Sequence, residues 1–353
     1  MGATACCHGM DQSGLEPRLP EKRDIVVIGT SAGGVSALTR LFSAMPQDCA
    51  PTVFVVMHIT PTARSLLPRL LQRVGWLPAF HPTDGEPIRP GHIHVAPPDH
   101  HLLVLRDRVL IRRGPRENRT RPAVDPLFRS AGVAFGSRVV GVVLSGTLDD
   151  GASGLRAVHR CGGTSVVQDP DDAQWPGMPA SAIARNPIDH VVPLDRMATL
   201  LARLVSEPAP ARPPVPFDIA VEARIAEQEL TTVSDDTQTV GVPTTLSCPE
   251  CGGGLSEIRD GPTLRFRCKV GHAYSLDAMN EAQAEAMEKA LWVALRTHED
   301  RVELFRRMAD HARGRGHDRL AANWDRQMAE ARNHADLLRQ VLSNPDLKRA
   351  NEP

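Results

Sequence analysis

Short hydrophobic runs recur along the first 205 residues, and each ends at a glycine or a polar residue. The runs cover residues 24–29, 52–57, 92–96, 139–144 and 164–168, and stretches with helical spacing at 34–45, 63–74 and 152–161 separate several of them. Continuous hydrophobic strands that alternate with amphipathic helices are typical of a parallel sheet covered on both faces. We therefore expect an α/β fold with a doubly wound parallel sheet over residues 24–205.

The pattern changes on both sides of this region. The predicted parts are a flexible tail at 1–23, a proline-rich linker with a short helix (220–230) at 206–246, a Cys/Gly-rich module at 247–275, a helical segment at 276–343 and a tail at 344–353. Within the helical segment, hydrophobic residues recur every three or four positions before and after Gly314-Arg315-Gly316. This pattern predicts two helices that form an αα-hairpin, whose hydrophobic seam is used for mutual packing or for a partner.

Composition narrows the class of protein. The 353 residues suit two domains, at about 150 residues each. Hydrophobic residues make up 41%, which excludes global disorder, and a net charge of −1 does not favour nucleic acid or an anionic membrane as partner. The sequence shows no signal peptide and no long hydrophobic span, so we expect a cytoplasmic protein without direct membrane insertion. Its seven cysteines are then reduced thiols or metal ligands.

A serine follows the first predicted strand, in Gly29-Thr-Ser31-Ala-Gly33-Gly34. Gly-x-Ser-x-Gly between a strand and a helix is the pattern of a nucleophile elbow, in which a sharp turn exposes the serine hydroxyl. The alternative is a phosphate-binding loop of a nucleotide fold. That alternative requires a glycine where Ser31 stands and an acidic residue after the second strand, where the chain has His58. The sequence therefore favours a serine esterase.

A histidine and a pair of aspartates follow two other strands. His58 comes after residues 52–57, and Asp149-Asp150 come shortly after residues 139–144. The carboxyl ends of parallel strands meet at one edge of the sheet, so we expect these groups near Ser31 as general base and orienting carboxylate. The chain order Ser, His, Asp differs from the Ser, Asp, His of α/β-hydrolases.

Together these residues resemble the CheB-type chemotaxis receptor methylesterases. The similarity covers residues 24–205 and rests on Ile28-Gly-Thr-Ser31-Ala-Gly-Gly34, Val56-Met-His58, Pro90-Gly-His-Ile-His-Val-Ala-Pro-Pro98, Asn118-Arg-Thr-Arg-Pro122 with Val124-Asp125 and Leu127-Phe128, Leu144-Ser-Gly146 leading to Asp150-Gly151, Gln168, and Gly177-Met-Pro179. The resemblance implies that Ser31, His58 and Asp150 hydrolyse methyl esters of glutamate side chains on chemotaxis-type receptors. Deamidation of receptor glutamines is a second implied activity.

The resemblance also implies a substrate rim formed by Arg119, Arg121, Asp125 and Met178, although ion pairs that hold a loop are the alternative for the three charged residues. Two departures from the family pattern are visible. Gly146-Thr147-Leu148 stands where many members have Gly-Met-Gly. Classical members also have an N-terminal receiver domain, for which 23 residues are too few, so we expect control by a separate response regulator or sensor protein instead of phosphorylation of this chain.

The Cys/Gly-rich module has the spacing of a metal site. Cys248-x₂-Cys251 and, further on, Cys268-x₃-His272 supply four ligands suited to tetrahedral zinc. Four protein ligands indicate a closed structural site rather than a catalytic one, and catalysis itself is expected to need no cofactor. A non-catalytic sensory scaffold that binds partners through this module and the hairpin is the alternative to an enzyme, but it would not need Ser31, His58 and Asp150 together.

Overall fold

The computed structural model describes residues 21–227, 241–261 and 263–344. Most of the predicted tails (1–20 and 345–353), the end of the predicted linker helix (228–230) and the rest of 231–240 lie outside the described residues.

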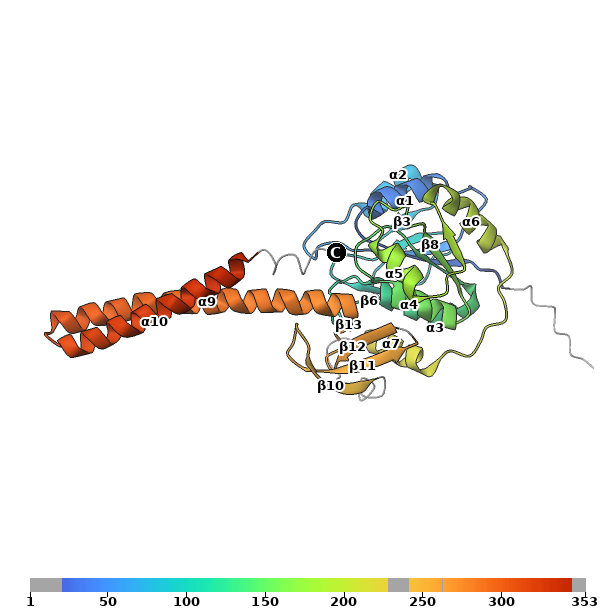
Figure 1. The fold of residues 1–353 in the computed structure, drawn as a ribbon. Coiled ribbons are helices and arrows are strands. Elements are labelled where there is room, and N and C mark those ends of the chain that lie inside the picture. The colour runs from blue at the N-terminus through green and yellow to red at the C-terminus, as the bar shows by residue number, and fades with distance from the viewer. Residues whose placement is uncertain (1–20, 228–240, 262, 345–353) are drawn as a thin grey trace, which may run out of the picture.

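A seven-stranded sheet forms the centre of the larger unit (Figure 1). Its order is β3-β4-β2-β1-β7-β8-β9, and every pairing in it is parallel. The strands are β1 (Ile25–Thr30), β2 (Thr52–Met57), β3 (Ala79–Phe80), β4 (Ile93–Val95), β7 (Val139–Val143), β8 (Thr164–Gln168) and β9 (His190–Val192). The five predicted strands are therefore present, with ends that agree to within one or two residues.

Helices cover both faces of this sheet, as predicted. Alternate side chains of a strand point to opposite faces, so Val26 and Ile28 pack with α1 (Gly34–Ser43), α2 (Leu67–Val74) and α6 (Leu194–Ser206). Ile25 and Val27 pack on the other face with α3 (Val124–Phe135), α4 (Ala152–Arg160) and α5 (Gly177–Arg185). Figure 1 shows α1 and α2 above the sheet and α3 and α4 below it. A hairpin of β5 (His101–Val104) and β6 (Val109–Arg112), which we did not predict, packs beside α3.

The proline-rich segment lies on this unit. Ser137 Oγ donates a hydrogen bond of 2.7 Å to the carbonyl of Pro210, and the Arg212 guanidinium donates to the carbonyl of Ala134. The helix that follows, α7 (Phe217–Glu227), packs against α3, with Ile219 buried. The described linker is therefore bound along the surface of the larger unit.

A four-stranded antiparallel sheet forms the C-terminal module. Its strands are β10 (Val242–Ser247), β11 (Gly254–Asp260), β12 (Thr263–Cys268) and β13 (Ala273–Ser275). Its core is small and includes Leu255, Phe266 and Tyr274. The module packs against the larger unit.

Buried charges join the module to the larger unit. Arg265 and Arg267 of β12 pair with Glu222 of α7, at 2.6 and 3.0 Å, and Arg267 also reaches Glu117 at 3.0 Å. Glu117 in turn pairs with Arg129 of α3 at 2.8 Å. Burial opposes ionisation of Glu222, but the arginines outweigh it and hold the pKa of this carboxyl well below its usual value. The joint is therefore charged and solvent-excluded.

Removing one charge from this joint should destabilise the protein strongly. Glu222→Gln leaves Arg265 buried without its carboxylate and Arg267 with Glu117 alone, and breaking a buried pair costs about 3–5 kcal/mol. Urea denaturation of the two proteins measures the loss. The control is Glu303→Gln, because Glu303 makes its ion pairs with Arg306 and Arg307 on an exposed helix face. Equal midpoints for Glu222→Gln and the wild type would show that the buried pairs contribute nothing.

A long helical hairpin extends from the C-terminal module, as the sequence predicts for 276–343. Helix α9 (Leu276–Gly314) begins at Ser275, whose side chain accepts a hydrogen bond from the amide of Ala278, and α10 (Asp318–Ser343) returns along it. Phe305 stacks on Trp324, with ring centroids 5.7 Å apart. Figure 1 shows the hairpin projecting away from the rest of the molecule. The seam therefore serves mutual packing, except at Leu320, which is exposed.

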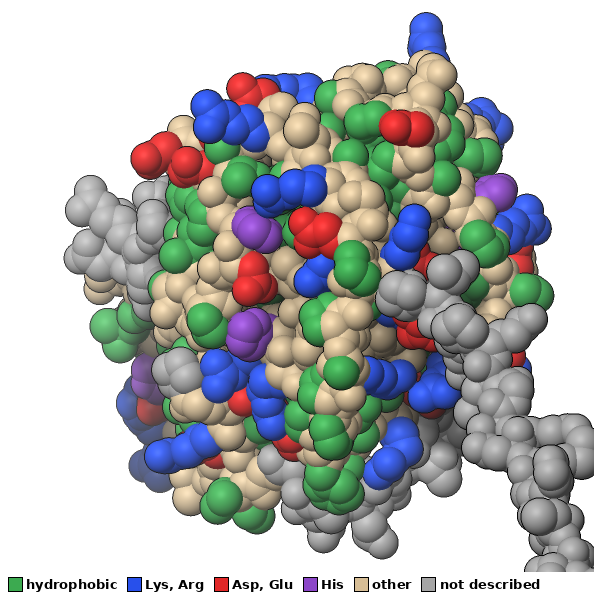
Figure 2. Space-filling model, turned by 90° about the vertical axis from the view of Figure 1, so that its right-hand side faces the viewer, with side chains coloured by type: hydrophobic (Ala, Val, Ile, Leu, Met, Phe, Trp, Pro, Cys, Tyr) green, Lys and Arg blue, Asp and Glu red, His purple; other side chains and the backbone are tan. Residues whose placement is uncertain are grey.

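One face of the molecule shows the mixture of charges expected from the near-zero net charge (Figure 2). On the face opposite the hairpin, basic and acidic side chains are interspersed (Figure 2). In the described part of the chain, no helix combines the length and hydrophobicity needed to cross a membrane.

Candidate active site

Ser31 occupies the turn between β1 and α1. β1 ends at Thr30 and α1 begins at Gly34, so three residues make the connection. Gly33 has a φ of 75°, and a Cβ there would lie 2.8 Å from the hydroxyl of Ser145. The turn therefore needs glycine both for its backbone conformation and for space. Gly146 also lies close, since a Cβ on it would be 2.9 Å from the Cβ of Ser31.

His58 follows the strand that pairs with β1. Met57, the last residue of β2, pairs with Thr30, and the amide of His58 donates to the carbonyl of Thr30 at 3.1 Å. Ser31 and His58 are therefore the next residues beyond two adjoining strand ends. No hydrogen bond joins the two side chains in the described structure, and such bonds often form only when substrate is bound.

Asp150 holds the imidazole from the other side. Its Oδ2 lies 2.7 Å from His58 Nε2, and the carboxylate is 2% exposed. The amides of Val124 and Asp125 and the side chain of Asn118 donate to the same carboxylate. Burial raises the pKa of Asp150, but the hydrogen bond and charge of His58 outweigh it, so the pKa lies below the usual value. When Nε2 donates to this carboxylate, Nδ1 is the basic nitrogen of His58.

Asp149 has other partners. It forms a partly buried ion pair with Arg185, and its Oδ1 accepts a hydrogen bond of 2.7 Å from the hydroxyl of Ser275 in the C-terminal module. The geometry therefore joins Asp150, and not Asp149, to His58.

Arg119 and Arg121 lie where the sequence placed a substrate rim. Together with His58 and Thr120 they line a cavity of about 340 Å³. Both are also paired: Arg121 with Asp99 at 2.7 Å, and Arg119 with Glu281 and Glu285 of α9. The ion pairs expected as the alternative are therefore present, and substrate contact by Arg119 and Arg121 stays a prediction.

Asp125 and Met178 correct the sequence prediction. They are 3% and 1% exposed, so neither side chain is available to a substrate. Asp125 lies beside Asp150, where its Oδ1 accepts hydrogen bonds from the amides of Gly151 and Gly154. Burial and the charge of Asp150 raise the pKa of Asp125 to about 7. The family motif marked these positions, but their burial depends on helices α3 and α5, which the hydrophobic pattern did not predict.

Leu148 shows what the departure from Gly-Met-Gly means for the backbone. Its φ is 63°, the left-handed region that favours glycine. Leucine therefore adopts a glycine-like conformation there, a type of strain that is common at functional sites.

The loop 116–121, which we call the active-site loop, connects His58 and Asp150 to the C-terminal module. Thr120 Oγ1 lies 3.4 Å from His58 Nε2, and Asn118 donates to Asp150. A second cavity, of about 560 Å³, lies between this loop, the Pro249-Glu250 turn and residues 282–289 of α9. Asn118 and Thr120 belong to a sequence motif that by itself assigns them no role, because only tertiary contacts reveal one.

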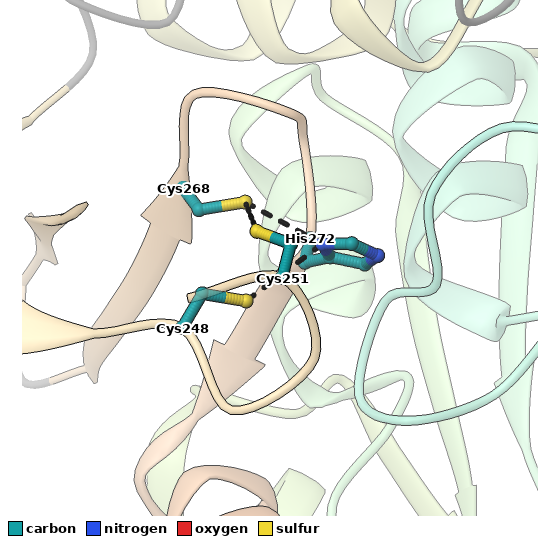
Figure 3. Close-up of side chains that lie close together, drawn as sticks. All are labelled: Cys248, Cys251, Cys268 and His272. Carbon is teal, nitrogen blue, oxygen red and sulfur yellow. Dashed lines mark hydrogen bonds between the residues drawn. The ribbon is translucent and has the colours of Figure 1, made fainter. Parts of the chain in front are cut away.

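The predicted metal ligands come together in the C-terminal module (Figure 3). The ligand atoms of Cys248, Cys251, Cys268 and His272 all lie within 4.8 Å of one another. The sulfurs of Cys251 and Cys268 are 3.7 Å apart, and His272 Nδ1 is 3.5 Å from Cys268 Sγ. A tetrahedral zinc site with Zn–S bonds near 2.3 Å requires ligand separations of about 3.5–3.8 Å. The donor set and its spacing therefore fit a metal ion.

The surroundings of this cluster also suit a cation. Burial, followed by the neighbouring thiols of Cys248 and Cys251, raises the pKa of Cys268, so the thiols resist joint ionisation without a positive charge between them. Glu250 lies 3.3 Å from Nε2 of His272, and a carboxylate commonly holds a metal-binding histidine in place in this way. Within the described residues, this is the one group of three or more such side chains placed to share an ion.

Comparison with known proteins assigns the larger unit. The profile of the family described as CheB methylesterase matches residues 26–201. A protein-glutamate methylesterase/protein-glutamine glutaminase of Rhodospirillum rubrum is 38% identical over 196 residues, 54% of this chain and 50% of that protein. A Leptospira interrogans protein named for the same two activities is 35% identical over 182 residues, 51% of this chain and 94% of that protein.

A solved structure supports the same assignment. The crystal structure of the Thermotoga maritima CheB methylesterase catalytic domain aligns over its whole length with 53% of this chain, with a TM-score of 0.50 and 30% identity. The chain spans about half the length of several of the curated relatives that it matches.

Proposed function

The chain belongs to the CheB methylesterase family, and on that basis we propose that it hydrolyses γ-methyl esters of glutamate side chains on methyl-accepting chemotaxis-type receptors. Deamidation of receptor glutamines is part of the proposal, because the curated relatives are named for both activities. The proposed protein partners are the methylated receptor domains and a separate response regulator or sensor protein.

The proposed mechanism assigns one role to each triad residue. Ser31 Oγ attacks the ester carbonyl while His58 accepts its proton. His58 then returns this proton to the departing methoxide, which leaves as methanol, and a water molecule activated by His58 hydrolyses the acyl-enzyme to glutamate. Asp150 orients the imidazole and stabilises its cation. The observation that supports this proposal most is the 2.7 Å hydrogen bond between His58 and a buried carboxylate, at the strand end next to Ser31.

Methanol release from methylated receptor tests the substrate assignment. Wild-type protein should release methanol from methylated receptor and ammonia from a receptor that carries glutamine at the same positions, and Ser31→Ala should release neither. Methanol release that is equal in both proteins would assign the reaction to another group. No release by wild type would favour the scaffold alternative.

We also propose that Cys248, Cys251, Cys268 and His272 hold one structural zinc ion. Zinc would supply the charge that lets the thiolates ionise together, and it would link the loop after β10 to the turn between β12 and β13.

Zinc should be stoichiometric and stabilising. Elemental analysis should find about one zinc per chain. Cys268→Ser should lose it and lower the Tm, because the module has a small hydrophobic core. Cys49→Ser is the control, since Cys49 is a buried thiol of the larger unit and is not part of the cluster. Full zinc content in Cys268→Ser would contradict the assignment.

A further inference from the structure

The active-site loop pairs with the C-terminal module through its backbone. Glu117 and Ala273 form a parallel β-bridge, the amide of Asn118 donates to the carbonyl of Ala273 at 2.8 Å, and the amide of Ala273 donates to the carbonyl of Arg116 at 3.3 Å. The loop that contacts His58 and Asp150 is therefore attached along β13, and β13 lies outside the part of the chain that the family profile matches.

One side chain of this loop contacts both the triad and the module. Asn118 is 6% exposed. Its Nδ2 donates to Asp150 Oδ1 at 3.0 Å and to Asp125 Oδ2 at 2.9 Å. Its Oδ1 accepts from the amide of Ser275 at 3.0 Å. Both protons of the amide nitrogen are thus directed at carboxylates, and the oxygen is directed at the module.

We propose that Asn118 is a positioning residue for Asp150 and that the amide of Ser275 fixes its orientation. A side-chain amide can turn over and exchange its oxygen and nitrogen. If Asn118 did so, its oxygen would face two buried carboxylates, and its NH₂ group would face the N–H of Ser275. A backbone N–H can only donate, so it selects the orientation in which Asn118 donates to the triad.

The consequence for catalysis follows from the position of Asp150. One of its oxygens orients His58, and the other is held by Asn118 and by the amide of Asp125. Without the donor from Asn118, Asp150 and Asp125 face each other with less compensation, and only the amides of Val124 and Asp125 still hold Asp150 in place beside His58. The C-terminal module thereby supports the chemical step and not only the fold.

A second contact holds the neighbouring residue in place. The hydroxyl of Ser275 donates to Asp149, and Arg185 joins Asp149 to Asp277 of α9. The start of α9 thus fixes the chain on both sides of the peptide bond between Asp149 and Asp150. The proposal rests on the triad assigned under the proposed function.

Two substitutions at Ser275 distinguish the contribution of its amide to catalysis from that of its hydroxyl. Ser275→Pro removes both, and Ser275→Ala removes only the hydroxyl. The φ of Ser275 is −70°, which proline adopts without strain, and Tyr274 before it is extended in β13. On a small methyl ester, Ser275→Pro and Asn118→Ala should each lower kcat by about 100-fold, because small misplacements of a catalytic group have effects of this size. KM should stay near the wild-type value.

The matched variants decide the result. Ser275→Ala should keep kcat within about 5-fold of wild type, and combining Ser275→Pro with Asn118→Ala should add little to Asn118→Ala alone, since both remove the same support. Equal kcat values for Ser275→Pro and Ser275→Ala would overturn the role of the module. Wild-type kcat in Asn118→Ala would overturn the whole proposal, and this variant is decisive even if Ser275→Pro does not fold. Undiminished activity in Ser31→Ala would instead refute the proposed function.

Discussion

Replacing Ser31 or His58 by alanine should each reduce kcat for ester hydrolysis by on the order of 10⁴-fold or more, and the double variant should lose little beyond that. The reason is that the two residues act as one unit: Ser31 is a poor nucleophile unless His58 accepts its proton, and His58 has no role without the hydroxyl. The two adjoining strand ends that carry them are fully paired, so neither substitution should disturb the sheet.

Single-turnover assays on a methyl ester measure this loss, and circular dichroism and Tm verify the fold. Additive losses, in which the double variant falls far below either single one, would mean that the residues serve separate steps. A residual rate of 10³–10⁴ above the uncatalysed reaction is expected from binding and oxyanion contacts alone.

The second large effect should separate two adjacent aspartates. Asp150→Asn keeps the shape of the side chain, but its amide competes to donate to His58 Nε2 and stabilises the wrong tautomer, so kcat should fall about 10⁴-fold. Asp149→Asn should leave kcat within about 10-fold of wild type. It should lower the Tm instead, because it removes the charge of a buried carboxylate from its partly buried ion pair with Arg185.

Activity and thermal denaturation of the two variants, measured side by side, test this separation. A larger kcat loss in Asp149→Asn than in Asp150→Asn would reverse the assignment of the orienting carboxylate. A pronounced loss of kcat in both variants would show that the contact between Asp149 and Ser275 also supports the chemistry.

The hydrophobic pattern could predict the central strands because they are buried on both faces and end at glycine or polar residues. β2 and β8 have the predicted bounds. Helix α3 was not predicted, and its burial explains why: nearly every residue from Val124 to Phe135 is buried, including Asp125 and Arg129, so it has no polar face to give a helical period.

The residues of the candidate site also fall into a predictable and an unpredictable group. Positions that depend on local sequence, such as Ser31 in its strand-turn-helix motif or the two pairs of metal ligands, could be predicted. Positions that depend on partners far along the chain could not. Arg265 and Arg267 alternate with hydrophobic residues in β12, a pattern that predicts a solvent-exposed strand face, but they face Glu222 and Glu117 across the joint. Asn118 gains its role only when Ser275, 157 positions away, reaches it.

The length of α9 has a geometric consequence. Its 39 residues, at about 1.5 Å each, make a rod of about 58 Å, and its first turns line the cavity beside the active-site loop. A rod stiffened by α10 does not behave like a flexible tether, because it holds its far end at a fixed radius from the catalytic centre. If the protein were anchored by that tip, its active site could move only at a nearly constant distance from the anchor, on a spherical shell around it. Ester groups on that shell would be within reach, and those beside the anchor would not.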